Sequence, residues 1–146
     1  MATVTAISPI KSHTHIANAI NYVKSPTDSN EHEKAHEVSC INCYDSQIDS
    51  LSAQFYRTRA ANNNDKGILV HHYVQSFAPD ENITPEEAHL IGLELAKKTM
   101  PGYQIVVSTH IDKDHIHNHI LINSVNAQTG YKWRGNKDTL NDLRTE

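Results

Sequence analysis

One ten-residue segment holds the side chains of this sequence that are best suited to chemistry. It reads His110-Ile-Asp-Lys-Asp-His115-Ile-His117-Asn-His119. On a strand, residues two apart share a face and lie about 6.7 Å apart along it, so three alternate histidines span about 13 Å. One ion cannot bind His115, His117 and His119 together over that span, because metal–imidazole bonds measure about 2.0–2.2 Å.

A hairpin within this segment removes the difficulty. If the two residues before His115 form the turn, His110 lies directly opposite His117, with Cβ atoms about 5 Å apart on one face. His110, His117 and His119 can then converge on one cation, and three neutral imidazoles leave coordination positions for a substrate oxygen. Either aspartate of the segment could orient an imidazole through its second nitrogen. The alternatives for these histidines are an exposed histidine-rich strand or a structural zinc site.

The elements that position this hairpin follow from hydrophobic periodicity and from capping residues. The pattern predicts strands over 3–10, 67–77, 103–110 and 115–125, a short strand over 131–135, and helices over 12–23, roughly 46–61, and 84–99. Thr84, Pro85 and Glu87 give the clearest helix start, a capping box with proline at the first helical position. Residues 24–44 are polar and predict a surface loop, and the tail from Asn136 looks helical.

These elements predict a single α+β domain over residues 1–146, with a central, largely antiparallel sheet of about five strands and flanking helices. We expect Tyr56 and Tyr73 to belong to the core. Arg57 and Arg59 are expected on a solvated helix face.

Composition limits the classes of function. The chain has 146 residues, of which 38% are hydrophobic and 21% charged, and its formal net charge of −4 argues against a general nucleic-acid binder. DNA binding must therefore be local, and a bound divalent cation would assist it. There is no apolar run of about 18 residues and no secretory signal, so we expect no membrane insertion and a cytoplasmic location. The two cysteines then indicate reduced thiols.

The motif H-x-D-x-D-H-x-H-x-H, followed by an apolar run and Asn123-Ser124, resembles the metal motif of MOBP-type mobilisation relaxases of the HUH endonuclease superfamily. The resemblance extends over nearly the whole chain, and it is strongest to mobilisation proteins of small plasmids from low-GC Gram-positive bacteria. The similar segments are INYVKSP, Gly67 to Phe77, TPEEAHLIGLELAKK before PGYQIVVSTH, Asn123 to Asn126, Thr129-Gly130 and Asn136-Lys137. Because relatives are longer, we expect the chain to be truncated from a longer protein.

Two segments depart from the family pattern. Relatives often have Asn-Pro after the tyrosine helix, where this chain has Ser25-Pro26. They also tend to have Gly-x-Asn-Cys where this chain reads Cys40-Ile-Asn42-Cys43. The second departure leaves the 24–45 segment poorly matched to the family.

The resemblance implies specific roles. It places the nucleophilic tyrosine at Tyr22, the metal ligands at the three histidines above, and a DNA-contacting serine at Ser76. The implied activity is nicking and rejoining of single-stranded DNA at a transfer origin through a 5′-phosphotyrosyl intermediate, with Mn²⁺ or Mg²⁺ as cofactor. Because imidazoles bind Mn, Ni, Cu or Zn more tightly than Mg, another transition metal could occupy the site in purified protein. An accessory mobilisation protein and a coupling protein of a type IV secretion system are the implied partners.

Two further groups would complete such a site. A phenol is a weak nucleophile at neutral pH, so a base is needed. His115 and Asp112 are the nearest candidates, and weaker ones are His13, His15, His71 and His72. For the strand itself, Lys132, Trp133 and Arg134 offer a base-stacking ring with flanking cations beside the metal hairpin. A buried tryptophan with two solvated neighbours is the alternative.

Other functions remain open. In a replication-initiator HUH nuclease the tyrosine follows the histidine motif, where this chain offers Tyr131. A non-catalytic, metal-dependent single-strand-binding module and a metal storage or sensing protein are further alternatives. His32, His36, Cys40 and Cys43 suggest a rival zinc site, although their spacing is too short for the usual finger. The letters His-Asn-His at 117–119 also match HNH nucleases, but the apolar strand that follows does not fit their ββα arrangement.

Overall fold

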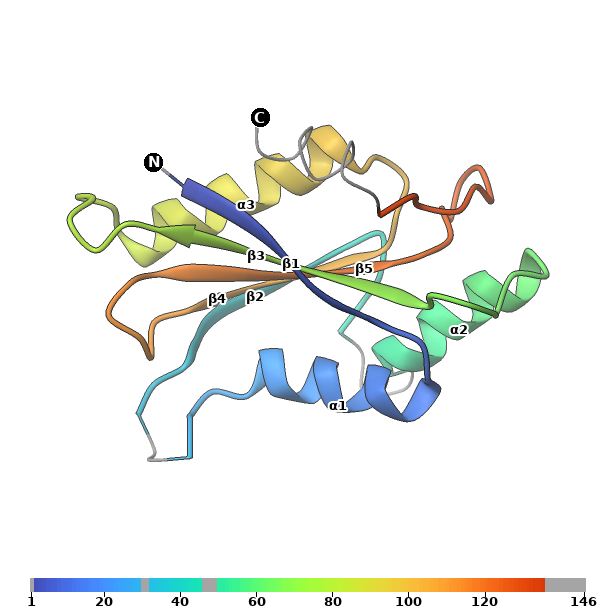
Figure 1. Ribbon diagram of the computed structural model, residues 1–146, viewed down its shortest axis with the longest axis horizontal. Coiled ribbons are helices and arrows are strands. Elements are labelled where there is room, and N and C mark those ends of the chain that lie inside the picture. Colours follow the sequence, from blue (N-terminus) through green and yellow to red (C-terminus); the bar gives the residue numbers. More distant parts are fainter. Residues whose placement is uncertain (1, 30–31, 46–49, 136–146) are drawn as a thin grey trace.

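The computed structural model describes residues 2–29, 32–45 and 50–135. Its elements are β1 (Ala2–Ile10), α1 (His13–Lys24), β2 (Ala35–Ile41), α2 (Leu51–Ala61), β3 (Val70–Phe77), α3 (Pro85–Thr99), β4 (Ile105–His110) and β5 (His117–Asn123). The strands form one antiparallel sheet in the order β1-β3-β5-β4-β2. Helices α1 and α2 lie on one face of this sheet and α3 lies on the other (Figure 1). The predicted α+β architecture is confirmed.

The helix starts follow the capping residues. Ser12 accepts a hydrogen bond from the His15 backbone N–H and begins α1, which buries Ile16, Ile20 and Val23 against the sheet. At α3 the predicted capping box of Thr84 and Glu87 is present. Ser50 caps α2, and the predicted start of that helix at 46–49 lies outside the described residues. Among the described helices, none has the length and apolar character that a membrane span requires.

The β4–β5 hairpin has the register that the metal geometry requires. His110 pairs with His117, and Ser108 pairs with His119. Because strand side chains alternate between faces, these four side chains point to the same side of the sheet, toward α1. Asn118, the middle letter of His-Asn-His, points to the opposite face, where its amide nitrogen donates to the Ala88 carbonyl of α3.

The predicted loop over 24–44 is wrong in part, because it contains β2. This strand is an edge strand that pairs only with β4 among the described strands, and none of its residues is fully buried. Val38 and Cys40 face α1, whereas Ser39 hydrogen-bonds the His89 ring of α3 at 2.7 Å. A short edge strand of mixed polarity gives too weak a periodic signal for sequence analysis to detect.

The predicted strand over 131–135 is also wrong. Only an isolated bridge joins Val125 to Lys132, and the Trp133 N–H donates to the Ser124 carbonyl. The tail predicted to be helical, including Asn136-Lys137, lies outside the described residues.

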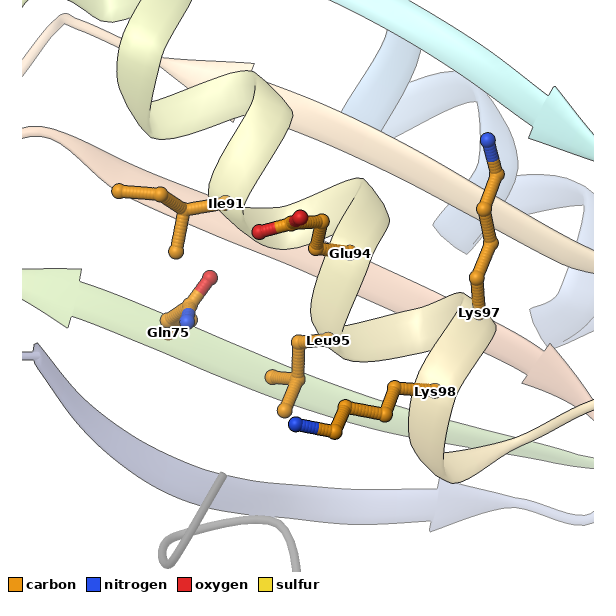
Figure 2. Close-up of a pocket in the computed structure, with 6 residues that line it drawn as sticks. All are labelled: Gln75, Ile91, Glu94, Leu95, Lys97 and Lys98. Atoms are coloured by element: carbon orange, nitrogen blue, oxygen red, sulfur yellow. The ribbon is translucent and has the colours of Figure 1, made fainter.

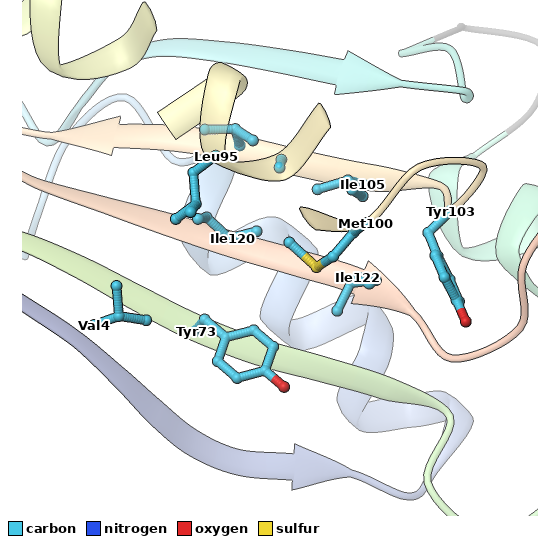
Figure 3. Packing of buried hydrophobic residues seen from close by; sticks show 10 residues of the cluster. Val4, Tyr73, Leu95, Met100, Tyr103, Ile105, Ile120 and Ile122 are labelled. Atoms are coloured by element: carbon cyan, nitrogen blue, oxygen red, sulfur yellow. The ribbon is translucent and has the colours of Figure 1, made fainter. Parts of the chain in front are cut away.

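Two hydrophobic clusters sandwich the sheet. The cluster beneath α3 includes Tyr73, as predicted, together with Met100 and Ile120 (Figure 3). The cluster beneath α1 and α2 is built around Phe55 and Val70.

Two burial predictions for α2 are wrong. Tyr56 is 47% exposed, and Arg59 is fully buried whereas Arg57 is exposed. Arg59 is buried because it bridges elements: Nε donates to Asp65 and Nη1 donates to the Asn123 side chain. A buried guanidinium requires such partners, and neither lies at a helical spacing from Arg59, since Asp65 is 6 residues away and Asn123 is 64.

Gly92 marks the closest approach of α3 to the sheet. A Cβ added at Gly92 would lie 2.6 Å from the amide nitrogen of Asn118, which is held by hydrogen bonds to Gln75 and Ala88. We therefore expect Gly92→Ala to lower the free energy of unfolding by about 1–3 kcal/mol, despite the better helix propensity of alanine. Urea denaturation measures this, with the 63% exposed Leu90→Ala on the same helix as control. A stabilised Gly92→Ala protein would contradict this packing.

Candidate metal centre and active site

Three histidines meet on the α1 side of the sheet. His110, His117 and His119 are buried, and each offers a ring nitrogen within 4.8 Å of the others. The Nδ1 atom of His110 and the Nε2 atom of His119 are buried and have no hydrogen-bond partner in the described part of the chain. Unpaired buried nitrogens are costly unless a ligand satisfies them. The donor set therefore fits a divalent transition metal.

The second nitrogen of each imidazole is held by the protein. His110 Nε2–H donates to the Val23 carbonyl at 2.9 Å, and His119 Nδ1 lies 2.8 Å from His72 Nε2. His117 Nδ1 lies 3.4 Å from the carbonyl of His115. Such contacts fix the tautomer that leaves the other nitrogen free to bind a metal. The sequence predicted this orienting role for an aspartate, but two backbone carbonyls and another histidine hold the rings.

The environment keeps these imidazoles neutral. Burial lowers the pKa of His110 to about 4 and that of His119 to about 2, and it also lowers the pKa of His117. Burial likewise lowers the pKa of His72 to about 4. Neutral imidazole is the form that coordinates metal, so the unliganded site is ready to bind at neutral pH.

His72 is expected to strengthen metal binding without being a ligand. Removing its ring in His72→Ala frees the His119 imidazole to rotate, so we expect Mn²⁺ affinity to fall by about 10- to 100-fold. Isothermal titration calorimetry measures the effect. His71→Ala is the matched control, because His71 is a buried neighbour on β3 that faces the other side of the sheet. Equal losses in the two variants would exclude a specific role for His72.

Tyr22 lies at the end of α1, above the triad. Its ring centre is 6.0 Å from that of His110 and 5.8 Å from that of His119, and the side chain is 51% exposed. The next residue fixes this end of the helix, because the Val23 carbonyl accepts hydrogen bonds from Ser108 and His110. Carbonyls in the last helical turn lack helical partners, and here the metal-site strands supply them.

An open cleft of about 750 Å³ adjoins Tyr22. Its lining is polar and comes from α1, the 25–34 segment and the β4–β5 turn: Asn18, Asn21, Tyr22, Ser25, Thr27, Asp28, Ser29, Lys34, Asp112 and Lys113. Asp112 is therefore on the same cleft as the phenol, and its Oδ1 is buried without a hydrogen-bond partner among the described residues. His115 is not among the lining residues, although its ring centre is 5.5 Å from that of His117. Of the two candidate bases, Asp112 is better placed.

Ser76 lies beside the triad. It pairs with His117 across β3 and β5, so both side chains point to the same face. Of the weaker base candidates, His13 binds Asp65 and His71 faces the other side of the sheet, whereas His72 contacts the His119 ring.

The segment 132–134 is not beside the metal hairpin, and that expectation is wrong. It follows the far end of β5, and the Trp133 indole donates to the Tyr73 hydroxyl on the α3 side of the sheet. Lys132 donates to the Lys66 carbonyl. Arg134 is exposed. DNA contact by Lys132, Trp133 or Arg134 stays a prediction, and it would require the strand to leave the cleft and pass the end of the sheet.

The structure also bears on two alternatives. Tyr131, the candidate nucleophile of an initiator-type nuclease, is 75% exposed beyond the end of β5, away from the hairpin that carries the triad. For the rival zinc site, His36 contacts Glu33 and Glu86 instead of the cysteines. Within the described residues the triad is the only group of metal-ligating side chains of this kind, so the rival site is not formed.

A separate hollow of about 380 Å³ lies on the opposite side of the sheet. Figure 2 shows its lining side chains on α3 and β3, among them Gln75, Leu95 and Lys98. None of the candidate catalytic or metal-binding residues lines it, so it is not part of this site.

One residue of the cleft had no sequence signal. Lys34 precedes β2 in the segment predicted to be a loop, and only 5% of it is exposed. Its Nζ atom lies 4.0 Å from the ring centre of Tyr22. A single lysine in a polar segment carries no periodicity or motif, and its position depends on the missed strand.

Comparison with known proteins supports the interpretation of this site. Residues 22–145 match the family described as relaxase, MobA/VirD2-like, nuclease domain. Two proteins of Staphylococcus aureus named protein rlx are similar: one is 46% identical over 122 residues, covering 84% of this chain and 34% of the relative, and another is 42% identical over 139 residues, covering 95% and 38%. The group II intron-interrupted relaxase LtrB of Lactococcus lactis is 28% identical over 142 residues, covering 82% of this chain and 25% of the relative.

The fold has a solved counterpart, in work described as the molecular basis of vancomycin resistance transfer in Staphylococcus aureus. The TM-score is 0.62 at 10% identity, and the match covers 99% of this chain and 87% of the other. The fold and the histidine site define a relaxase nuclease domain. The chain belongs to the MobA/VirD2-like relaxase family, and it spans about a third of the length of the rlx proteins.

Proposed function

We propose that this domain nicks and rejoins one strand of single-stranded DNA at a transfer origin, with Tyr22 as the nucleophile. The observation that carries the proposal is the position of the Tyr22 ring, within 6.0 Å of the ring centres of both His110 and His119. The phenol is half exposed beside a buried group of three neutral imidazoles, where a nucleophile can meet both a substrate phosphate and a metal held by those rings.

The chemistry is a transesterification. The Tyr22 oxygen attacks the phosphorus, the bond from phosphorus to the 3′ oxygen breaks, and a 5′-phosphotyrosyl bond replaces it. The phenolic proton goes to Asp112, and the departing 3′ oxygen takes up a proton from water in the open cleft to become a hydroxyl. One phosphodiester replaces another, so the step is reversible and requires no ATP. Strand rejoining is the same step in reverse.

His110, His117 and His119 would hold the divalent ion, and Mn²⁺ or Mg²⁺ is the proposed cofactor. When bound, such an ion polarises the non-bridging phosphate oxygens as a Lewis acid. Residues of the chain supply the nucleophile, the proton acceptor and a phosphate contact. Tyr22 presents the nucleophile, Asp112 holds its proton, and Ser76 donates to the phosphate beside His117. His115 is the second candidate base.

The broader role is the start of plasmid mobilisation. The transfer-origin strand is the proposed DNA partner, and an accessory mobilisation protein and a coupling protein of a secretion system are the proposed protein partners. The family relationship supports these assignments, which concern relaxases as whole proteins, and the chain spans about a third of the length of the rlx proteins.

A covalent-capture assay tests the proposal. The chain is incubated with Mn²⁺ and a pool of randomised single-stranded oligonucleotides labelled at either the 5′ or the 3′ end, and the products are denatured in detergent. We expect the 3′ label to stay with the protein and the 5′ label to be released. Mass spectrometry then identifies the modified peptide. No adduct, or an adduct on the peptide that contains Tyr131, overturns the assignment.

A further inference from the structure

The backbone of Lys34 is fixed between the two halves of the active site. Its N–H donates to the Pro26 carbonyl, just after the helix that carries Tyr22, at 2.9 Å. Its own carbonyl accepts a hydrogen bond from the N–H of Ile111, just after His110, also at 2.9 Å. Lys34 thus has a defined place relative to both the phenol and the metal ligands.

The side chain of Lys34 turns inward. Its Nζ atom lies 4.0 Å from the ring centre of Tyr22, within the range of a cation–π contact. Lys34 also lines the cleft next to Tyr22 and Asp112.

Within residues 2–29, 32–45 and 50–135 this ammonium has no anionic partner. No carboxylate of the described residues lies within ion-pair distance of Lys34, although the residue is only 5% exposed. A buried, unpaired charge is unfavourable, and the ring face of Tyr22 compensates only part of its lost hydration. The cleft therefore combines a fixed ammonium with a cation site, and both attract an anion.

A phosphodiester fits this arrangement. Its non-bridging oxygens bear the negative charge and accept hydrogen bonds from ammonium groups. Because the chain has a net charge of −4, phosphate attraction depends on local cations such as this one.

We propose that Lys34 is a further residue of the nicking site, where it positions the Tyr22 ring and binds an oxygen of the phosphodiester next to the triad. This inference rests on the proposed function, because it takes single-stranded DNA as the ligand. Arginine at this position would keep both the cation–π contact and the phosphate contact, whereas methionine would keep only the packing volume.

DNA binding is measured without chemistry in a Tyr22→Phe background, by fluorescence anisotropy with a 5′-labelled 25-nucleotide strand of random sequence over a range of salt concentrations. We expect Lys34→Met to weaken binding about fivefold to tenfold and to reduce the slope of log affinity against log salt by about 0.7, the loss of one phosphate contact. Lys34→Arg should keep the slope. The control is Lys24→Met, because Lys24 is on the same helix as Tyr22 but pairs with Asp45 outside the cleft.

A second readout separates a charge role from a structural one. If Lys34 only supported the fold of the triad, Lys34→Met would weaken Mn²⁺ binding. The proposed role leaves Mn²⁺ affinity unchanged or raised, because a like charge near the imidazoles has been removed. Thermal unfolding confirms that each variant is folded.

The outcomes are distinct. An unchanged salt slope in Lys34→Met, or an equal loss in Lys34→Arg and Lys34→Met, overturns the role of Lys34. Absence of a covalent adduct in the wild-type protein would overturn the proposed function instead, and the binding measurement on Lys34 would still be decisive for Lys34.

Discussion

Replacing Tyr22 with phenylalanine is expected to abolish formation of the covalent protein–DNA adduct and to lower the nicking rate by about three orders of magnitude or more. The change removes one oxygen atom and keeps the aromatic ring. The ring contacts with His110 and His119, and the contact with the Lys34 ammonium, are therefore retained. Because the side chain is 51% exposed, we expect unfolding free energy to change by no more than about 0.5 kcal/mol.

The effect is measured with a strand that the wild-type protein cleaves, identified from the capture assay. Tyr131→Phe is the matched control, because Tyr131 is also exposed and is the candidate nucleophile of an initiator-type nuclease. Full activity in Tyr131→Phe and none in Tyr22→Phe would support the relaxase assignment. A persistent adduct in Tyr22→Phe would move the nucleophile elsewhere in the chain.

The site could be predicted from sequence where local rules determine geometry. The two-residue periodicity of strands and the length of the turn were enough to place His110 opposite His117, and the hairpin confirms that pairing. The helix that carries Tyr22 begins at its predicted cap, Ser12. The assignment of Tyr22 itself depended on family resemblance, because a tyrosine near a helix end has many uses.

The rest of the site depends on contacts between distant segments. Lys34 meets Tyr22 only because β2 pairs with β4, and a short polar edge strand gave no usable signal. His72 reaches His119 through the β3–β5 register, which no local pattern fixes. The carbonyl that holds the His110 ring is the backbone group of Val23. Every residue has such a group, so no residue type in the sequence indicates this role.

Replacing one imidazole of the triad should disable both metal binding and catalysis. For His119→Ala we expect Mn²⁺ affinity to fall by at least about 100-fold, since the loss of a ligand should exceed the loss of an orienting contact. Without the ion, the phosphate loses stabilisation of several kcal/mol, and about 4 kcal/mol corresponds to a thousandfold lower nicking rate. Chelation of the wild-type protein with EDTA should have the same effect and be reversed by Mn²⁺. His32→Ala is the control, because His32 is exposed and outside the triad.

The same imidazoles set the acid sensitivity of the metal-free protein. Their folded-state pKa values lie below the ordinary value of about 6.5, so between pH 6.5 and about 4 the unfolded chain binds protons that the folded protein does not. The free energy of unfolding must therefore fall as pH decreases through this window, by roughly 1–2 kcal/mol per buried imidazole at pH 5 compared with pH 7.5. Urea denaturation at the two pH values measures the change.

The variant His119→Ala tests the cause. Its free energy of unfolding should fall less than that of the wild type as the pH decreases, because it lacks one of the buried imidazoles. An identical pH dependence in the two proteins, together with unchanged Mn²⁺ affinity, would mean that His119 is neither buried in neutral form nor a ligand, and the proposed metal centre would have to be abandoned.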